Sequence, residues 1–343
     1  MASFLRALTA EALRAMTPLR EGERRLGETI RTLPAGAGLV EGLRALPEAG
    51  FALLLIPEDI GVRANFGRPG TASLPMVTLR RLVAMQDNPS VRGASIVAVG
   101  EVDVQDLMQQ AVRLDPSRPA ELESLRRLVS EVDARVAQVV EAIAREGRTL
   151  IAIGGGHENA FGVLAGVRGA LGGGCSCVNL DAHADLRADA GRHSGNPFSK
   201  ALDAGHLARY AAIGLHEPYL NEHMWERLHA DPRLLAVTLE TMLRGESSLE
   251  SACDRAIGHA GPGPATLEID LDAIAGMPAS ASSPTGLQPE ALRGALHRIA
   301  SRLDTRALHV CEGIPGDGDP HGVGKYAAML VCDFIRARRG LLA

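Results

Sequence analysis

One short stretch near the middle of the chain, residues 181–185 (DAHAD), constrains the fold most strongly. It follows an apolar run, residues 175–180 (CSCVNL), which is typical of a buried β-strand. Alternate side chains of a strand share a face, so we predict that Asp181, His183 and Asp185 point the same way. Two carboxylates and an imidazole buried without partners would cost several kcal/mol, and one or two divalent cations would remove that cost. The stretch therefore predicts a strand that leads into a metal site.

Two other stretches have the same form. Residues 151–158 (IAIGGGHE) are an apolar run that ends in glycines and His157, and residues 266–272 (TLEIDLD) end in Asp270 and Asp272. The predicted metal ligands are therefore three strand-end groups: His157, Asp181, His183, Asp185, Asp270 and Asp272. Six nitrogen and oxygen ligands without a thiolate fit two hard-to-borderline ions better than one zinc ion enclosed by cysteines.

Each group also has a simpler interpretation. His157 alone is typical of a buried histidine with satisfied hydrogen bonds, and residues 181–185 could form a hydrogen-bonded polar network. Asp270 and Asp272 could cap a following helix, although two caps two residues apart would be redundant. The convergence of all three groups on strand ends favours the metal site.

The chain alternates between apolar runs and amphipathic segments. We predict strands at residues 51–56, 95–100, 149–153, 175–181, 210–214, 234–239, 265–271 and 307–312. We predict helices at 121–146, 158–171, 217–230, 241–258, 288–303 and 322–338. This alternation predicts a single three-layer α/β/α domain over residues 1–343, with a mainly parallel sheet of about eight strands and an N-terminal helical extension over residues 1–45. Ligands of such sheets gather at the carboxyl ends of the strands, where the three groups lie.

Composition excludes several classes of protein. A formal net charge of −5 argues against a nucleic-acid-binding protein, which normally carries a basic surface. No apolar run approaches the roughly 18 residues that span a bilayer, so we expect no membrane segment. The five cysteines are odd in number and form no disulfide pattern, which predicts reduced core residues of a cytoplasmic protein.

The order of the motifs resembles a known superfamily, the ureohydrolases, which include arginase, agmatinase and formimidoylglutamase. The resemblance rests on the family's three metal-binding motifs, here residues 154–158 (GGGHE), 181–185 (DAHAD) and 270–272 (DLD). Residues 57–71 also resemble the family's first loop, and residues 311–315 (CEGIP) resemble its late segment with an active-site glutamate. The match spans about residues 53–316 in the same order and implies an arginase-like fold.

Within the superfamily, the chain is most similar to formimidoylglutamase. Arginases and agmatinases usually carry Gly-Gly-Asp-His at the first motif, whereas residues 154–158 read GGGHE. After the second motif, residues 193–199 read HSGNPFS, and the Ser-Gly-x-Pro-Phe form is similar to formimidoylglutamase. Pro197 and Phe198 stand where arginase has a catalytic histidine. His193 and His216 are the candidates to replace it.

The resemblance implies a manganese-dependent hydrolase with two Mn²⁺ ions per chain that activate water to cleave the C–N bond of a linear amidine. The implied reaction converts N-formimidoyl-L-glutamate and water to L-glutamate and formamide, in histidine degradation. By resemblance, Glu312 and His193 are the catalytic candidates, and Arg187, Ser194 and Asn196 are the substrate-binding candidates. The family also implies a homo-oligomer.

Two departures leave other functions open. The family often has Asp-x-Asp-x-x-Asp-Pro at the third motif, but Ala275 and Gly276 stand where Asp-Pro is expected. An agmatinase, a guanidinobutyrase or an arginase-like enzyme acting on another amidine or guanidine is therefore an alternative. A metal-bound subunit that has lost catalysis is a second alternative, because the usual histidine is missing. Arg187 also has a simple interpretation as a solvated surface side chain.

Overall fold

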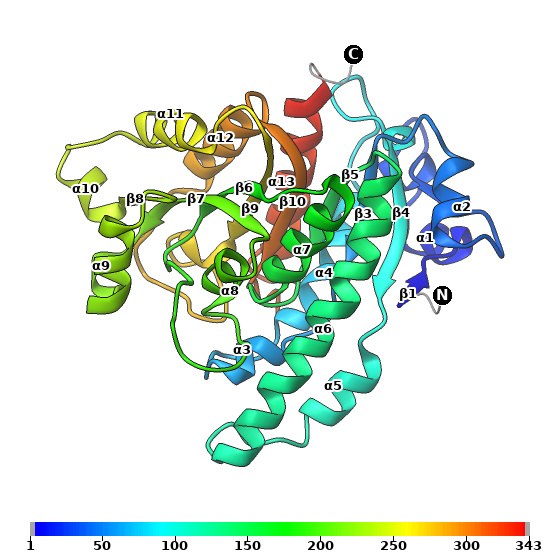
Figure 1. Cartoon of the computed structure of the whole chain (residues 1–343). Coiled ribbons are helices and arrows are strands. Elements are labelled where there is room, and N and C mark those ends of the chain that lie inside the picture. The colour runs from blue at the N-terminus through cyan, green and yellow to red at the C-terminus, as the bar shows by residue number, and fades with distance from the viewer. Residues whose placement is uncertain (1–3, 340–343) are drawn as a thin grey trace.

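A ten-stranded sheet organises the computed structural model, which describes residues 4–339 (Figure 1). Eight strands form its continuous parallel part, in the order β4-β3-β5-β10-β9-β6-β7-β8. Their bounds are β3 (Phe51–Leu55), β4 (Ile96–Val102), β5 (Thr149–Ile153), β6 (Cys175–Leu180), β7 (Leu207–Leu215), β8 (Leu234–Thr238), β9 (Pro264–Asp270) and β10 (Asp304–Cys311). These are the eight strands predicted from the apolar runs, so the predicted mainly parallel sheet is confirmed.

Two short strands extend the sheet beside β4. β1 (Leu5–Ala7) pairs with β4 in the antiparallel direction, and β2 (Arg31–Thr32) pairs with it in parallel. The same N-terminal segment contains α1 (Ala10–Met16) and α2 (Leu39–Arg44). Residues 4–45 are therefore partly helical and partly sheet, whereas the sequence predicted a helical extension. The backbone groups of the edge strand β4 gain partners from β1 and β2. This pairing explains why two short segments without a strand pattern in the sequence become extended.

Helices cover both faces of the sheet (Figure 1). One face packs against α2, α6 (Pro119–Arg145), α7 (Asn159–Leu171) and α8 (Pro197–Asp203). The other packs against α4 (Leu74–Val83), α11 (Leu249–Ala260), α12 (Pro289–Ala300) and α13 (Val323–Arg339). The remaining helices are α3 (Ile60–Ala64), α5 (Gln105–Ala111), α9 (Glu222–Ala230) and α10 (Leu239–Leu243).

The strand β3 illustrates how the sequence produces these layers. Phe51, Leu53 and Leu55 belong to the core beneath α4 and α13, while Ala52 and Leu54 belong to the core beneath α6 and α7. Alternate side chains of a strand point to opposite faces, so a continuous apolar run requires cover on both sides. The predicted three-layer α/β/α arrangement follows from this pattern.

The longest helix, α6, has clear sequence signals at both ends. Pro119 occupies its first turn, and Gly147, with φ of 72°, follows its end. Its apolar residues recur every three or four positions and are buried against α7 and the sheet. No helix within residues 4–339 is long and apolar enough to cross a membrane.

Candidate metal centre

Four neighbouring strands bring polar residues to one edge of the sheet. In the order β5-β10-β9-β6, their carboxyl ends lead to His157, to Glu312, to residues 270–272 and to residues 181–185. β10 and β9 are in register, with Cys311 opposite Asp270. Strands far apart in the sequence therefore deliver their terminal side chains to one place, as the sequence predicted for a parallel sheet.

A glycine turn carries His157 into this edge. Gly154 and Gly155 have φ of 96° and 74°, which L-residues rarely adopt. A Cβ atom at Gly154 would also collide with the ring of Pro75. The backbone N–H of His157 then donates to Glu312 Oε1 at 2.6 Å. The glycines thus fold the chain back so that the imidazole and the β10 glutamate meet.

The residues after β6 converge for a different reason than predicted. β6 ends at Leu180, and residues 181–185 form a bend rather than a continued strand. Asp181 Oδ1 accepts the His183 N–H at 2.7 Å, and Asp185 has φ of 52°. The convergence of these side chains is as predicted, but the strand alternation that was its predicted cause is wrong.

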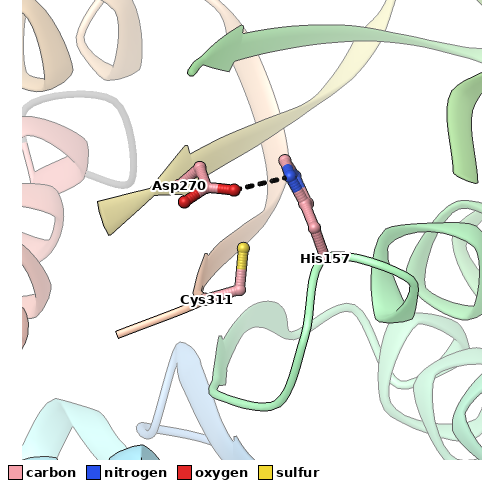
Figure 2. A group of neighbouring side chains, drawn as sticks. All are labelled: His157, Asp270 and Cys311. Carbon is pink, nitrogen blue, oxygen red and sulfur yellow. Dashed lines mark ion pairs between the residues drawn. The ribbon is translucent and has the colours of Figure 1, made fainter. Parts of the chain in front are cut away.

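The first ligand group surrounds the His157 ring. Its Nδ1 lies 3.2 Å from Asp181 Oδ2, 3.0 Å from Asp185 Oδ2 and 3.1 Å from Asp270 Oδ2. Figure 2 shows the contact with Asp270, where the carboxylate at the end of β9 faces the ring. All four residues are buried. A single imidazole proton cannot satisfy three carboxylates, so this group has the chemistry of a cation site.

The second group shares Asp181 with the first. His183 Nδ1 lies 3.0 Å from Asp272 Oδ2 and 3.7 Å from Asp181 Oδ1. Burial opposes protonation of His183, but the negative charge of Asp272 and its neighbours outweighs it and raises the His183 pKa to about 11. Such strong retention of a proton reflects an excess of negative charge. The two groups together offer the donors for two divalent ions that share one carboxylate.

Unpartnered polar atoms support the same fit. Both ring nitrogens of His157 and Asp272 Oδ1 are buried, and among residues 4–339 none of their contacts has the geometry of a hydrogen bond. Burial and the charge of Asp272 raise the pKa of Asp270 well above its usual value. Buried polar atoms normally have hydrogen-bond partners. These unpartnered nitrogen and oxygen atoms therefore fit the role of metal ligands better than that of members of a closed polar network.

A thiol also borders the centre, which the sequence analysis missed. Ligand atoms of Cys311, His157 and Asp270 lie within 4.8 Å of one another (Figure 2). Burial raises the Cys311 pKa well above its ordinary value, which favours the protonated thiol. All five cysteines are free. The sequence signal was the position of Cys311 directly before the candidate glutamate.

A pocket of about 240 Å³ opens onto both groups. It is lined by loop and strand-end residues: Asn65, Phe66, Gly67, His183, Ala184, Asp185, Arg187, Ser194, Gly195, Tyr219, Met224, Asp270, Asp272, Ser280, Ala281 and Glu312. Three of the predicted non-ligand residues, Arg187, Ser194 and Glu312, are therefore brought together at the ligand groups.

Glu312 and Arg187 each present an unpaired polar group to this pocket. Glu312 Oε2 is buried without a hydrogen-bond partner among residues 4–339, and burial raises the Glu312 pKa to about 8. Its φ of 66° is unusual for a non-glycine residue. Arg187 is exposed, and its guanidinium makes no hydrogen bond or ion pair within the described chain. The pocket thus offers one acceptor and one cation to a bound molecule.

His193, a predicted catalytic residue, and Asn196, a predicted substrate-binding residue, lie outside the pocket lining. His193 is buried, with Nε2 2.9 Å from Asp189 Oδ2, and burial lowers its pKa to about 4. Asn196 Oδ1 accepts from Arg192 and its Nδ2 donates to Gly191 O at 2.9 Å. Both side chains therefore hold the loop after the second motif in shape.

The residue that replaces the arginase histidine packs against the centre. The Phe198 ring lies edge-on to His157 with a centroid separation of 5.2 Å. The other candidate, His216, is buried and stacks on Tyr219, which in turn stacks on His183; both centroid separations are 4.9 Å. His216 does not line the pocket, so Tyr219 separates it from the ligand groups.

Comparison with known proteins agrees with this fold. A sequence model described as the arginase family matches residues 49–337, so the chain belongs to the arginase family. Formimidoylglutamase of Geobacillus thermodenitrificans is 31% identical over 310 residues, covering 85% of this chain and 84% of that protein. The family is therefore established both by its model and by an individual relative.

Solved structures show the same fold. Formimidoylglutamase from Bacillus subtilis superposes with a TM-score of 0.72 at 14% identity, covering 94% of each chain. Formiminoglutamase from Trypanosoma cruzi with two Mn²⁺ ions superposes with a TM-score of 0.70 at 17% identity, covering 92% of this chain and 98% of that one. The predicted arginase-like architecture is confirmed.

Proposed function

We propose that the chain hydrolyses the amidine C–N bond of N-formimidoyl-L-glutamate, giving L-glutamate and formamide. One observation carries this proposal: an unpaired acceptor, Glu312 Oε2, and an unpaired cation, Arg187, line the same small pocket beside two ligand groups. A cationic amidine at one end and carboxylates at the other match these charges. The relatives named formimidoylglutamase support the same substrate.

We infer two Mn²⁺ ions per chain. His157, Asp181, Asp185 and Asp270 would hold one ion, and Asp181, His183 and Asp272 would hold the other. Such ions, when bound, supply a Lewis acid and an activated water. A shell rich in carboxylates suits Mn²⁺.

Glu312 would orient the amidine. Its Oε1 is fixed by the His157 N–H, which leaves Oε2 free to accept from an amidinium N–H. A cation in the pocket would also favour the ionised carboxylate, despite the raised pKa that burial gives it. The charge-assisted hydrogen bond would hold the amidine carbon towards the ligand groups.

Arg187 would bind a substrate carboxylate, and its replacement is a direct test of the substrate class. A bidentate contact between a guanidinium and a carboxylate contributes about 1.5–3 kcal/mol. We therefore expect Arg187→Ala to lower kcat/KM for formimidoylglutamate by roughly ten- to a hundredfold, mainly through KM. Arg187→Lys should recover only part of this loss, because lysine cannot form the planar fork.

Metal content should stay unchanged in both Arg187 variants, because Arg187 belongs to neither ligand group. Arg14→Ala, which removes an exposed arginine of α1, serves as the matched control. Wild-type steady-state kinetics in Arg187→Ala would contradict this role and weaken the case for a dicarboxylate substrate.

The proposed function is tested by assaying Mn²⁺-loaded protein against formimidoylglutamate, arginine, agmatine, guanidinobutyrate and guanidine. Turnover of formimidoylglutamate alone is the expected result. Turnover of a guanidine instead would indicate an agmatinase, guanidinobutyrase or arginase-like activity. No turnover of any compound would favour the non-catalytic metal-bound subunit, the alternative that rests on the missing arginase-type histidine.

We also propose that the chain is one domain that forms a homo-oligomer in the cytoplasm. One sheet runs through the described chain, which supports a single domain. The resemblance to the ureohydrolase superfamily supports the homo-oligomer. Light scattering at micromolar concentration should give a multiple of the 36.1 kDa chain mass, and a monomeric mass would contradict the oligomer.

A further inference from the structure

A buried acid–imidazole pair lies behind the metal centre, inside the sheet. Glu268 on β9 and His309 on β10 are opposite each other in register, and both are fully buried. His309 Nδ1 lies 2.7 Å from Glu268 Oε2, and its Nε2 lies 3.2 Å from the carbonyl oxygen of Gly154. A carbonyl oxygen only accepts, so Nε2 carries a proton, and the 2.7 Å contact requires another proton between the acid and Nδ1. The pair is neutral as a unit.

The same acid faces the far side of the His157 ring. Glu268 Oε2 lies 3.7 Å from His157 Nε2, whereas His157 Nδ1 faces the three carboxylates of the first ligand group. Glu268 Oε1 and His157 Nε2 are both buried without a hydrogen-bond partner among residues 4–339. The carboxylate and the ring nitrogen lie in close contact, and each side chain has a buried polar atom without a partner. Each group is therefore the available partner of the other.

We propose that Glu268 is a positioning residue that accepts the Nε2 proton of His157 and so leaves Nδ1 free to bind a metal ion. Histidines that bind metals commonly donate their other ring N–H to a carboxylate, which fixes the tautomer and ring orientation. His309 neutralises Glu268. The centre therefore gains an oriented ligand without a further net negative charge beside its four aspartates.

This role rests on the proposed metal centre, but its test needs no substrate. Mn²⁺ affinities are measured by chelator competition on the full chain, fitted to two sites. We expect Glu268→Gln to weaken one ion by about 10–100-fold and to leave the other near its wild-type affinity. Only one ion should be weakened because Glu268 contacts His157 of the first group, whereas the histidine of the second group is His183.

A matched control separates positioning from general stability. Asp333 is another buried carboxylate, paired with Arg293 at 2.6 Å between α13 and α12. Asp333→Asn should lower the thermal stability and leave both Mn²⁺ affinities unchanged. Weakening of both ions by the same factor in Glu268→Gln would show a structural role only and would overturn the proposal.

A second variant guards against misfolding. Glu268→Asp retains the charge but shortens the side chain by one methylene, so it should withdraw the carboxylate from His157 and weaken the same ion. If circular dichroism shows that Glu268→Gln is unfolded, the Mn²⁺ affinities of Glu268→Asp decide between the outcomes. Wild-type affinities for both ions in a folded variant would overturn the positioning role of Glu268 and leave the metal centre in place. Absence of Mn²⁺ binding in the wild type would overturn the metal centre itself and this role with it.

Discussion

Asp181→Ala should release both metal ions and lower kcat/KM by at least about a thousandfold, since metal ions supply several kcal/mol of transition-state stabilisation. Asp181 is the residue shared by both ligand groups. Its Oδ2 lies 3.2 Å from His157 Nδ1, and its Oδ1 lies 3.7 Å from His183 Nδ1. Removing this carboxylate therefore weakens both groups at once, whereas removing Asp185 or Asp272 affects one group.

The measurement is metal content after gel filtration, together with steady-state kinetics at saturating Mn²⁺. Asp181→Asn is the conservative partner variant, because it keeps the side-chain oxygen that accepts the His183 N–H. It should preserve the fold and still lose metal, since an amide is a weaker ligand than a carboxylate. Asp333→Asn again controls for loss of a buried acid. Two bound ions and wild-type activity in Asp181→Ala would refute the binuclear centre.

The sheet and its ligand-bearing edge could be predicted from the sequence because both depend on local pattern. Apolar runs such as residues 51–55 need cover on both faces, and a polar residue directly after such a run lies at a strand end. The parallel order then brings these ends together. β1 and β2 could not be predicted in this way, because their strand structure comes from pairing with the edge of β4.

The loop after the second motif shows where local pattern fails. His193 resembles a catalytic candidate in the sequence, but the path of its loop is set by a distant contact. Arg192 Nε donates to Asp133 Oδ2 of α6 at 2.8 Å, and both side chains are buried. This ion pair turns His193 towards Asp189 and away from the pocket lining. A contact across 59 residues leaves no signal in the sequence around the histidine.

Residues inside the strands were missed for a related reason. Glu268 and His309 interrupt apolar runs, and each alone is ordinary in a strand. The contact between them depends on the β9–β10 register, which places them opposite each other behind His157. Sequence pattern predicts which face a side chain takes, but the neighbour across the sheet depends on strand order and register.

Glu312→Gln should lower kcat/KM by about a hundred- to a thousandfold while both metal ions stay bound. The two side chains have nearly the same shape, and the glutamine oxygen can still accept the His157 N–H that Glu312 Oε1 accepts at 2.6 Å. The second position then changes from an acceptor to an NH₂ donor. An amidinium offers only donors, so the charge-assisted hydrogen bond is replaced by a donor–donor contact. Loss of about 2.7–4 kcal/mol in the transition state corresponds to this factor.

The expected split between binding and chemistry identifies what Glu312 does. Glu312 belongs to neither ligand group, so metal content should equal that of the wild type. If the carboxylate orients the amidine as the reaction proceeds, kcat should fall more than KM rises. Glu250→Gln, on the exposed surface of α11, is the matched control and should leave both constants unchanged. Loss of a metal ion in Glu312→Gln would instead mean that the His157 N–H contact supports the ligand group, and unchanged kinetics would remove Glu312 from the amidine site.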